Sequence, residues 1–228
     1  MMNKKASFVR KFGGAGLAGA LVFGASAGAM AATFDVSADV QNALEVTQVQ
    51  PMSFGTLFAT AASDGSANGY SYLTLQPGGG FDDAGQNQSS NIPLISLGGA
   101  QPARGSVAVG STAEFQLTLP DTASSGLGAS SAVTLTGDDV IQLRIGGASG
   151  DPAVARFYLT DFTAGSATGG TIGTPTGNVY PVTPSFGSTA VEFGIGAVIL
   201  TDLNLTGTSR DTYEAGTYSG TFEVTASY

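Results

Sequence analysis

Residues 217–228 read TYSGTFEVTASY, and apolar and polar side chains alternate along them up to the carboxyl terminus. The apolar positions are Tyr218, Phe222, Val224, Ala226 and Tyr228. The opposite face carries only Thr, Ser and Glu. A period of two is typical of a β-strand that buries one face. An end so regularly patterned predicts a paired strand of a sheet, since a frayed tail has no reason to keep a buried face.

The same alternation recurs along the chain, most clearly at 34–41, 112–119, 141–145 and 191–196. Shorter apolar runs lie between these, separated by Gly, Pro, Ser, Asn and Asp. After the amino-terminal region, no stretch of ten residues has a helical apolar period. The pattern predicts about ten to twelve short antiparallel strands in a sandwich or barrel, forming one domain over residues 32–228.

The amino terminus has the order of a cleavable signal peptide. Four basic residues between positions 4 and 11 precede an uncharged stretch, 12–30, and the segment closes with small residues that end in Ala29-Met30-Ala31. The stretch is rich in Gly and Ala and shorter than the ~20 strongly apolar residues of a membrane anchor. We expect export and cleavage after Ala31.

Composition after that cleavage excludes several classes of partner and chemistry. Four arginines and no lysine oppose 17 acidic side chains, a net charge of −13. Such a surface disfavours nucleic acid and anionic lipid, which bind Lys and Arg clusters. The chain has no Cys and no His, so disulfides, histidine or thiolate metal sites and imidazole-based catalytic triads are ruled out.

Enzymatic motifs are correspondingly scarce. A G-x-S-x-G match at 24–28 lies inside the predicted signal peptide, and a phosphate loop needs a lysine that the mature chain lacks. Hydrolysis by two carboxylates stays open, since any two of the 17 acids can converge in a fold. We expect no enzyme.

Calcium is the one cofactor that the sequence suggests, and only weakly. Asp64, Ser66 and Asn68 alternate as oxygen ligands do in a calcium loop, with Gly69 at the sixth position. The twelfth position is Leu75, where a bidentate Glu is required. Two further acidic pairs are Asp82-Asp83 and Asp138-Asp139. Plain turns rich in Asp, Gly and Asn are the favoured interpretation of all three.

Three long connections are expected, at 59–69, 76–91 and 163–188, the last with a hairpin around 179–182. The third is longer than loops usually are in a compact domain. Such loops are either binding loops or weakly ordered insertions.

Three stretches carry a family resemblance: LEVTQVQPMSFGTL (44–57), VGSTAEFQLTLP (109–120) and AGTYSGTFEVTASY (215–228). They resemble the bacterial secreted family called domain of unknown function 4402 and, more loosely, the spore coat protein U domain of secreted pilin-like subunits. The most specific parts are Ser53-Phe54-Gly55 and Ala215-Gly216-Thr217-Tyr218.

The resemblance implies an immunoglobulin-like β-sandwich on or outside the surface of a Gram-negative-type cell, with assembly into fibres by strand exchange. The exchanged strand would present Phe34, Val36, Ala38 and Val40. Pairing of this segment within its own chain is favoured, because neighbouring strands usually pair in cis. The absence of cysteine departs from many pilin-like subunits.

The resulting hypothesis is an exported, non-catalytic structural or adhesive surface protein, and a possible fibre subunit. Its expected partners are copies of itself or a related subunit, with neither nucleic acid nor membrane insertion after signal cleavage. Two alternatives stay open: a small outer-membrane β-barrel, and a secreted carbohydrate- or ligand-binding module that uses the long loops.

Overall fold

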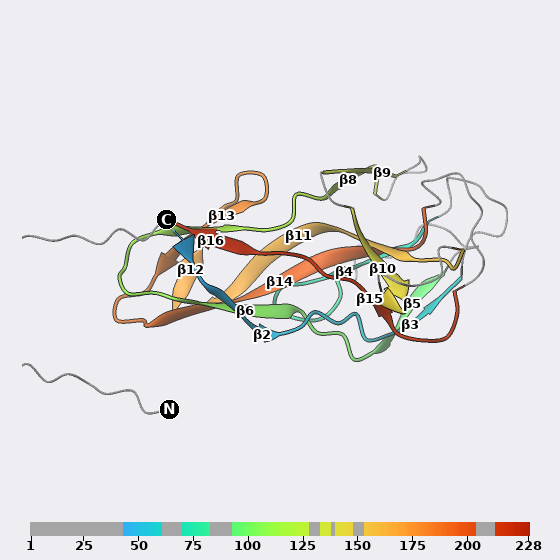
Figure 1. Cartoon of the computed structure of the whole chain (residues 1–228), viewed down its shortest axis with the longest axis horizontal. Coiled ribbons are helices and arrows are strands. Elements are labelled where there is room, and N and C mark those ends of the chain that lie inside the picture. The colour runs from blue at the N-terminus through green and yellow to red at the C-terminus, as the bar shows by residue number, and fades with distance from the viewer. Residues whose placement is uncertain are drawn as a thin grey trace, which may run out of the picture. The chain divides into compact units, whose positions relative to one another are not determined.

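The computed structural model describes residues 43–60, 70–82, 93–127, 133–137, 140–147, 153–203 and 213–228. All of them belong to one compact unit that begins at Val40. This part of the chain forms sixteen strands and no α-helix, and every pairing is antiparallel (Figure 1). The predicted all-β, antiparallel sandwich-like fold is confirmed, with more strands than the ten to twelve expected.

The larger sheet is built around one long central strand, β14. Its order is β15 (Tyr218–Ser219), β10 (Ile141–Ile145), β11 (Phe157–Thr168), β14 (Ala190–Leu200), β6 (Ala103–Ala108) and β2 (Val46–Gln50). On one side β14 pairs with β11 along most of its length. On the other side β6 pairs with its first half and β4 (Tyr72–Leu75) with its second half.

The second sheet contains both ends of the described unit. Its order is β1 (Ala43–Leu44), β16 (Thr225–Ser227), β7 (Phe115–Thr118), β13 (Val179–Pro184) and β12 (Gly170–Ile172). Two separate ribbons complete the unit, β3 (Thr56–Ala59) with β5 (Leu94–Gly98) and β8 (Ala123–Ser125) with β9 (Thr134–Thr136).

The main core contains side chains from both sheets. Phe193, Ile195 and Ile199 of β14 pack there in one cluster with Phe115 of β7 and Val182 of β13, and all five are at most 2% exposed. The alternate residues of β14 are covered as well, because Val198 and Leu200 join a second cluster with three buried tyrosines, Tyr70, Tyr72 and Tyr158. The central strand is therefore buried on both faces.

Two glycines of β14 allow another segment to cross it closely. A Cβ on Gly196 would lie 2.1 Å from the carbonyl oxygen of Leu75, and one on Gly194 would lie 2.1 Å from that of Pro77. These distances are far below van der Waals contact. The chain leaving β4 can cross β14 only because both positions lack a side chain.

The prediction of a loop at 163–188 is wrong for most of this range. Strand β11 continues to Thr168, and β12 and β13 follow as a hairpin that includes the one expected around 179–182. Asp161 and Ser166 have positive φ, and the register of β11 against β14 shifts near each of them. These irregularities interrupt the period of two by which the strand could have been predicted.

The carboxyl-terminal segment also differs from its prediction. The expected single strand is two short ones, and they pair in different sheets: β15 with β10, and β16 with β7. Between them, residues 220–224 lie in no strand. The burial alternation is nevertheless kept, since Phe222 and Val224 are partly buried against the main core and Thr221 and Glu223 are exposed.

Candidate functional site

A cleft of about 1120 Å³ opens into the core between residues 46–59 and residues 213–224. These two walls contain β2 and β15, which are the opposite edges of the seven-stranded sheet. We call this cleft the C-terminal groove. It lies where a further strand would have one sheet edge on each side.

The floor of the C-terminal groove is apolar. It is formed by Leu143, Phe157, Leu159, Phe193, Ile195 and Ile199. Five of these side chains are buried in the main core, and Leu143 packs against it. Such a floor favours a ligand that presents apolar side chains.

Gly105 of β6 shapes this floor. A Cβ at this position would lie 2.6 and 2.8 Å from two ring atoms of Phe193. The ring therefore lies directly against the β6 backbone, and any side chain at position 105 would displace it.

The carboxyl-terminal wall is open on both sides. A second cleft, of about 790 Å³, is lined by residues 219–223 from the other direction, together with Asp121 and Arg144. Residues 220–224 thus separate two open spaces, held there by the ring of Phe222, whose centroid lies 5.0 Å from that of Phe162. The sequence of this stretch alternates as a strand does, but its backbone pairs with no described strand.

Tyr218 fixes the turn before this stretch. Its hydroxyl accepts a hydrogen bond from Glu214 N at 3.0 Å and donates one to Glu214 O at 3.2 Å. A tyrosine that bonds backbone a few residues upstream in this way is the tyrosine corner known from Greek-key sandwiches. The motif Ala215-Gly216-Thr217-Tyr218 therefore has a structural role at the start of the groove wall.

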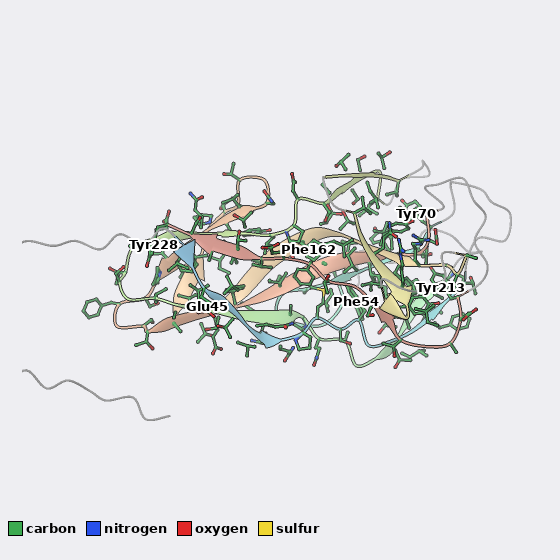
Figure 2. The ribbon with its side chains drawn as sticks, in the orientation of Figure 1. Glu45, Phe54, Tyr70, Phe162, Tyr213 and Tyr228 are labelled. Atoms are coloured by element: carbon green, nitrogen blue, oxygen red, sulfur yellow. The ribbon has the colours of Figure 1, made fainter. Side chains whose placement is uncertain are left out.

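The lining of the groove includes three aromatic rings in mutual contact, those of Phe157, Tyr213 and Tyr218, and Figure 2 labels Tyr213 among them. The ring of Phe157 stacks on Tyr213 with centroids 4.5 Å apart and meets the edge of Tyr218 at 5.2 Å. The hydroxyl of Tyr213 donates to Arg156 O at 3.0 Å and accepts from Asp202 N at 2.7 Å. Burial raises the pKa of Tyr213 well above its ordinary value, so the hydroxyl stays protonated and keeps both bonds.

Two guanidinium groups bind the side chain of Gln142, which lines the second cleft together with Arg144. Arg144 Nη2 donates to Gln142 Oε1 at 2.8 Å, and Arg156 Nη1 donates to the same oxygen. Asp202 accepts from Arg156 N at 2.9 Å. These hydrogen bonds link β10, the start of β11 and the residues that follow β14.

The opposite wall begins with the turn at Ser53-Phe54-Gly55. Ser53 and Gln101 exchange two backbone hydrogen bonds, of 2.9 and 2.7 Å, and Ser53 Oγ accepts from Gly55 N at 3.1 Å. Gly55 has φ +72°, and a Cβ there would lie 2.1 Å from Gly98 O. Phe54 is thereby turned into the core, beside the ring of Phe81.

The residues singled out from the sequence for binding lie outside the described residues. This applies to the strand-exchange candidates Phe34, Val36, Ala38 and Val40, and to the calcium candidates Asp64, Ser66 and Asn68. Asp83 and the pair Asp138-Asp139 are outside as well. Asp82 is described, and its carboxylate accepts from Gln76 Nε2 at 3.2 Å.

Two negative findings hold for the described ranges alone. No group of three or more His, Cys, Asp or Glu side chains lies together there as a metal site would require. No helix there is long and apolar enough to cross a membrane.

Comparison with protein-family models, with curated proteins and with solved structures gave no match. The resemblance to domain of unknown function 4402 therefore stays a prediction.

The sequence did not predict the groove itself. Its two walls are about 170 residues apart in the chain, and no local pattern relates them. A signal was nevertheless present, since the two most specific family-like motifs, 53–55 and 215–218, lie in opposite walls.

Proposed function

We propose that this protein is an exported structural or adhesive subunit that assembles with copies of itself by strand complementation. An extended segment of one copy would lie in the C-terminal groove of the next and pair with the exposed sheet edges. The single observation that carries the proposal is an apolar groove between two edges of one sheet, with residues 220–224 beside it outside any ladder.

Strand addition fits the chemistry of the groove and of the strand that would enter it. In this mode, main-chain hydrogen bonds give affinity and alternate side chains give specificity by entering pockets. A strand in the groove would place every second side chain on the apolar floor. The remaining side chains would face solvent, where the acidic character of the chain is tolerated.

The segment 33–41, TFDVSADVQ, has the required pattern. Phe34, Val36, Ala38 and Val40 alternate with polar or acidic residues. It precedes β1 directly, so it stays tethered to its own unit while it reaches a neighbour. Export through the predicted signal peptide would bring it to the mature amino terminus.

The test compares the mature protein from Ala32 with a variant carrying Val36→Asp and Val40→Asp. The two substitutions put charges on the face meant for the apolar floor, so we expect the wild-type chain to polymerise and the variant to stay monomeric by light scattering. The variant keeps its own groove, and a synthetic peptide of residues 33–41 should bind it. A peptide carrying the same two substitutions is the control.

A different result would place the segment in its own chain. If the wild-type chain is a monomer and the double variant unfolds at a lower denaturant concentration without binding the peptide, residues 33–41 pair in cis. The proposal of strand exchange is then wrong.

A further inference from the structure

Two exposed apolar sites lie on the described unit away from the groove floor. One is the turn 185–188 between β13 and β14, at whose tip Phe186 is 97% exposed. The other is an exposed face of the β3–β5 ribbon beside the C-terminal groove, which Phe58 also lines; Phe58, Ile95 and Leu97 are 49%, 48% and 66% exposed there. We call them the Phe186 turn and the Phe58 face. Exposed apolar groups gathered in one place are typical of interaction sites.

The backbone of the Phe186 turn is tightly defined. Ser188 N donates to Ser185 O at 3.1 Å, and Gly187 has φ +81°. These features define a tight turn with Phe186 at its second position and Gly at its third. Because the backbone at the tip is already ordered, binding of the ring costs mainly the rotamer entropy of one side chain.

The Phe58 face draws on both strands of the ribbon. Phe58 and Ile95 are direct partners, so they share one side of it. Leu97 follows on the same strand at a register shift, between Ser96 and Gly98, which pair with Leu57 and Thr56. All three side chains are exposed, so they offer apolar surface to an aromatic ring.

The two sites lie toward opposite ends of the unit. The Phe186 turn precedes β14, whose Ala190 pairs with Ala108, and further along Ile195 pairs with Ala103. The residues before Ala103, among them β5, continue in the direction away from the turn. Figure 1 accordingly shows β3 and β5 at one end, and β12 and β13 at the other.

Charge identifies a second copy as the occupant. The chain has net charge −9, so copies repel each other over most of their surfaces. The chain has no charged side chain from Phe162 to Val191, around the Phe186 turn. None lies in 46–60 or 93–103 either, the stretches that carry the Phe58 face. Two copies can approach most easily where both are uncharged.

We infer that the Phe186 turn of one copy binds the Phe58 face of the next copy, end to end. This inference rests on the proposed function and names a second contact in the same assembly. A contact between two different sites of identical copies builds a filament unless the rotation between copies closes it into a ring, and sites at opposite ends of the unit favour the filament. The strand pairings show where the described chain enters the unit. Ala43 pairs with Ser227 of β16. Ser227 and Pro181 of β13 both pair with Gln116 of β7, so Ala43 lies toward the end that carries the Phe186 turn.

The position of the C-terminal groove is consistent with the same end-to-end arrangement. Phe58 lines the C-terminal groove together with Tyr213, so the groove extends to the end that carries the Phe58 face. In the proposed contact, the end at which Ala43 enters one copy would therefore face the end of the next copy to which its groove extends. The end-to-end contact would align the two copies for strand exchange.

The experiment uses two full-length mature variants, Phe186→Lys and Leu97→Asp. Each places a charge on one of the two sites, and both positions are exposed, so folding should be unaffected. Each variant alone should raise the critical concentration for filaments about tenfold or more, as loss of a central aromatic contact does. Matched exposed controls in the β8–β9 ribbon, Thr134→Lys and Ser125→Asp, should polymerise as the wild type does.

Mixing the two variants is the decisive arm. The lysine introduced in one variant would face the aspartate introduced in the other at one junction, and two wild-type sites would meet at the next. An equimolar mixture should therefore form alternating filaments that neither variant forms alone. Filaments of Phe186→Lys alone at the wild-type concentration, or no recovery on mixing, would overturn the inference.

Peptide uptake separates this inference from the proposed function. Phe186→Lys, combined with Val36→Asp and Val40→Asp, should still bind the 33–41 peptide within about twofold of the parent variant, because the groove is untouched. Normal peptide uptake with unchanged polymerisation contradicts the end-to-end contact alone. Recovery on mixing without any peptide uptake contradicts strand exchange and supports the contact.

Discussion

The central strand β14 and the carboxyl-terminal segment 213–228 have the same kind of alternating sequence and opposite environments. Strand β14 is paired on both sides and buried on both faces. The carboxyl-terminal segment is paired only in β15 and β16, and clefts flank the stretch between. Alternation therefore indicates which face of a strand is buried and leaves open whether its edges are paired.

The largest expected effect comes from adding one methyl group to β14. In Gly196→Ala the new Cβ would meet Leu75 O at 2.1 Å and Pro77 N at 2.8 Å, both backbone atoms of the crossing segment. Because backbone cannot rotate away as a side chain can, we expect a loss of about 3 kcal/mol in the free energy of unfolding, measured in urea. Gly110→Ala, with open space around it, is the control and should stay near wild type.

An intermediate effect is expected at Tyr213, where the carboxyl-terminal segment begins. Tyr213→Phe removes the hydroxyl that bonds Arg156 O and Asp202 N, and should lower the free energy of unfolding by about 1–2 kcal/mol at pH 7. A loss below the error of urea denaturation would show that these two bonds do not anchor the segment.

The same substitution should change the response to alkali. The pKa of Tyr213 is raised in the folded chain, so its contribution is fully present below about pH 10 and is lost as pH rises above that value. Tyr213→Phe should lose less stability than the wild type between neutral pH and pH above 10. Equal losses in the two chains over this range would contradict a protonated Tyr213 hydroxyl that stabilises the fold.

The smallest effect is expected within the segment itself, at Gly216. A Cβ there would meet the tip of the Ile145 side chain at 2.6 Å, and this side chain can rotate. Gly216→Ala should cost less than about 1 kcal/mol in urea denaturation, in contrast to Gly196→Ala. Equal losses in the two variants would remove the difference between the two regions on which the proposal depends.

Much of the fold followed from periodicity in the sequence. The alternation at 112–119, 141–145 and 191–196 indicated β7, β10 and part of β14, since each buries one face against the main core. The pattern failed where both faces are buried or where register shifts intervene. Val198 and Leu200 are covered by a second cluster, and Asp161 and Ser166 break the register of β11.

The site was much less predictable, for a physical reason. A groove depends on which distant segments become neighbours and on where a sheet edge stays open, and neither leaves a local period. The stretches 53–55 and 215–218 are the most distinctive parts of the family resemblance. Their local roles, however, are a turn and a tyrosine corner. Only the three-dimensional arrangement places them in facing walls of one cleft.

The most direct test of strand acceptance is hydrogen–deuterium exchange at residues 221–224. It would be followed in the mature Val36→Asp, Val40→Asp chain, with and without the 33–41 peptide. We expect fast exchange of these amides beside slow exchange in β14, and strong protection once the peptide is bound. Slow exchange without the peptide, or no added protection at saturation, would contradict the claim that the C-terminal groove accepts a strand.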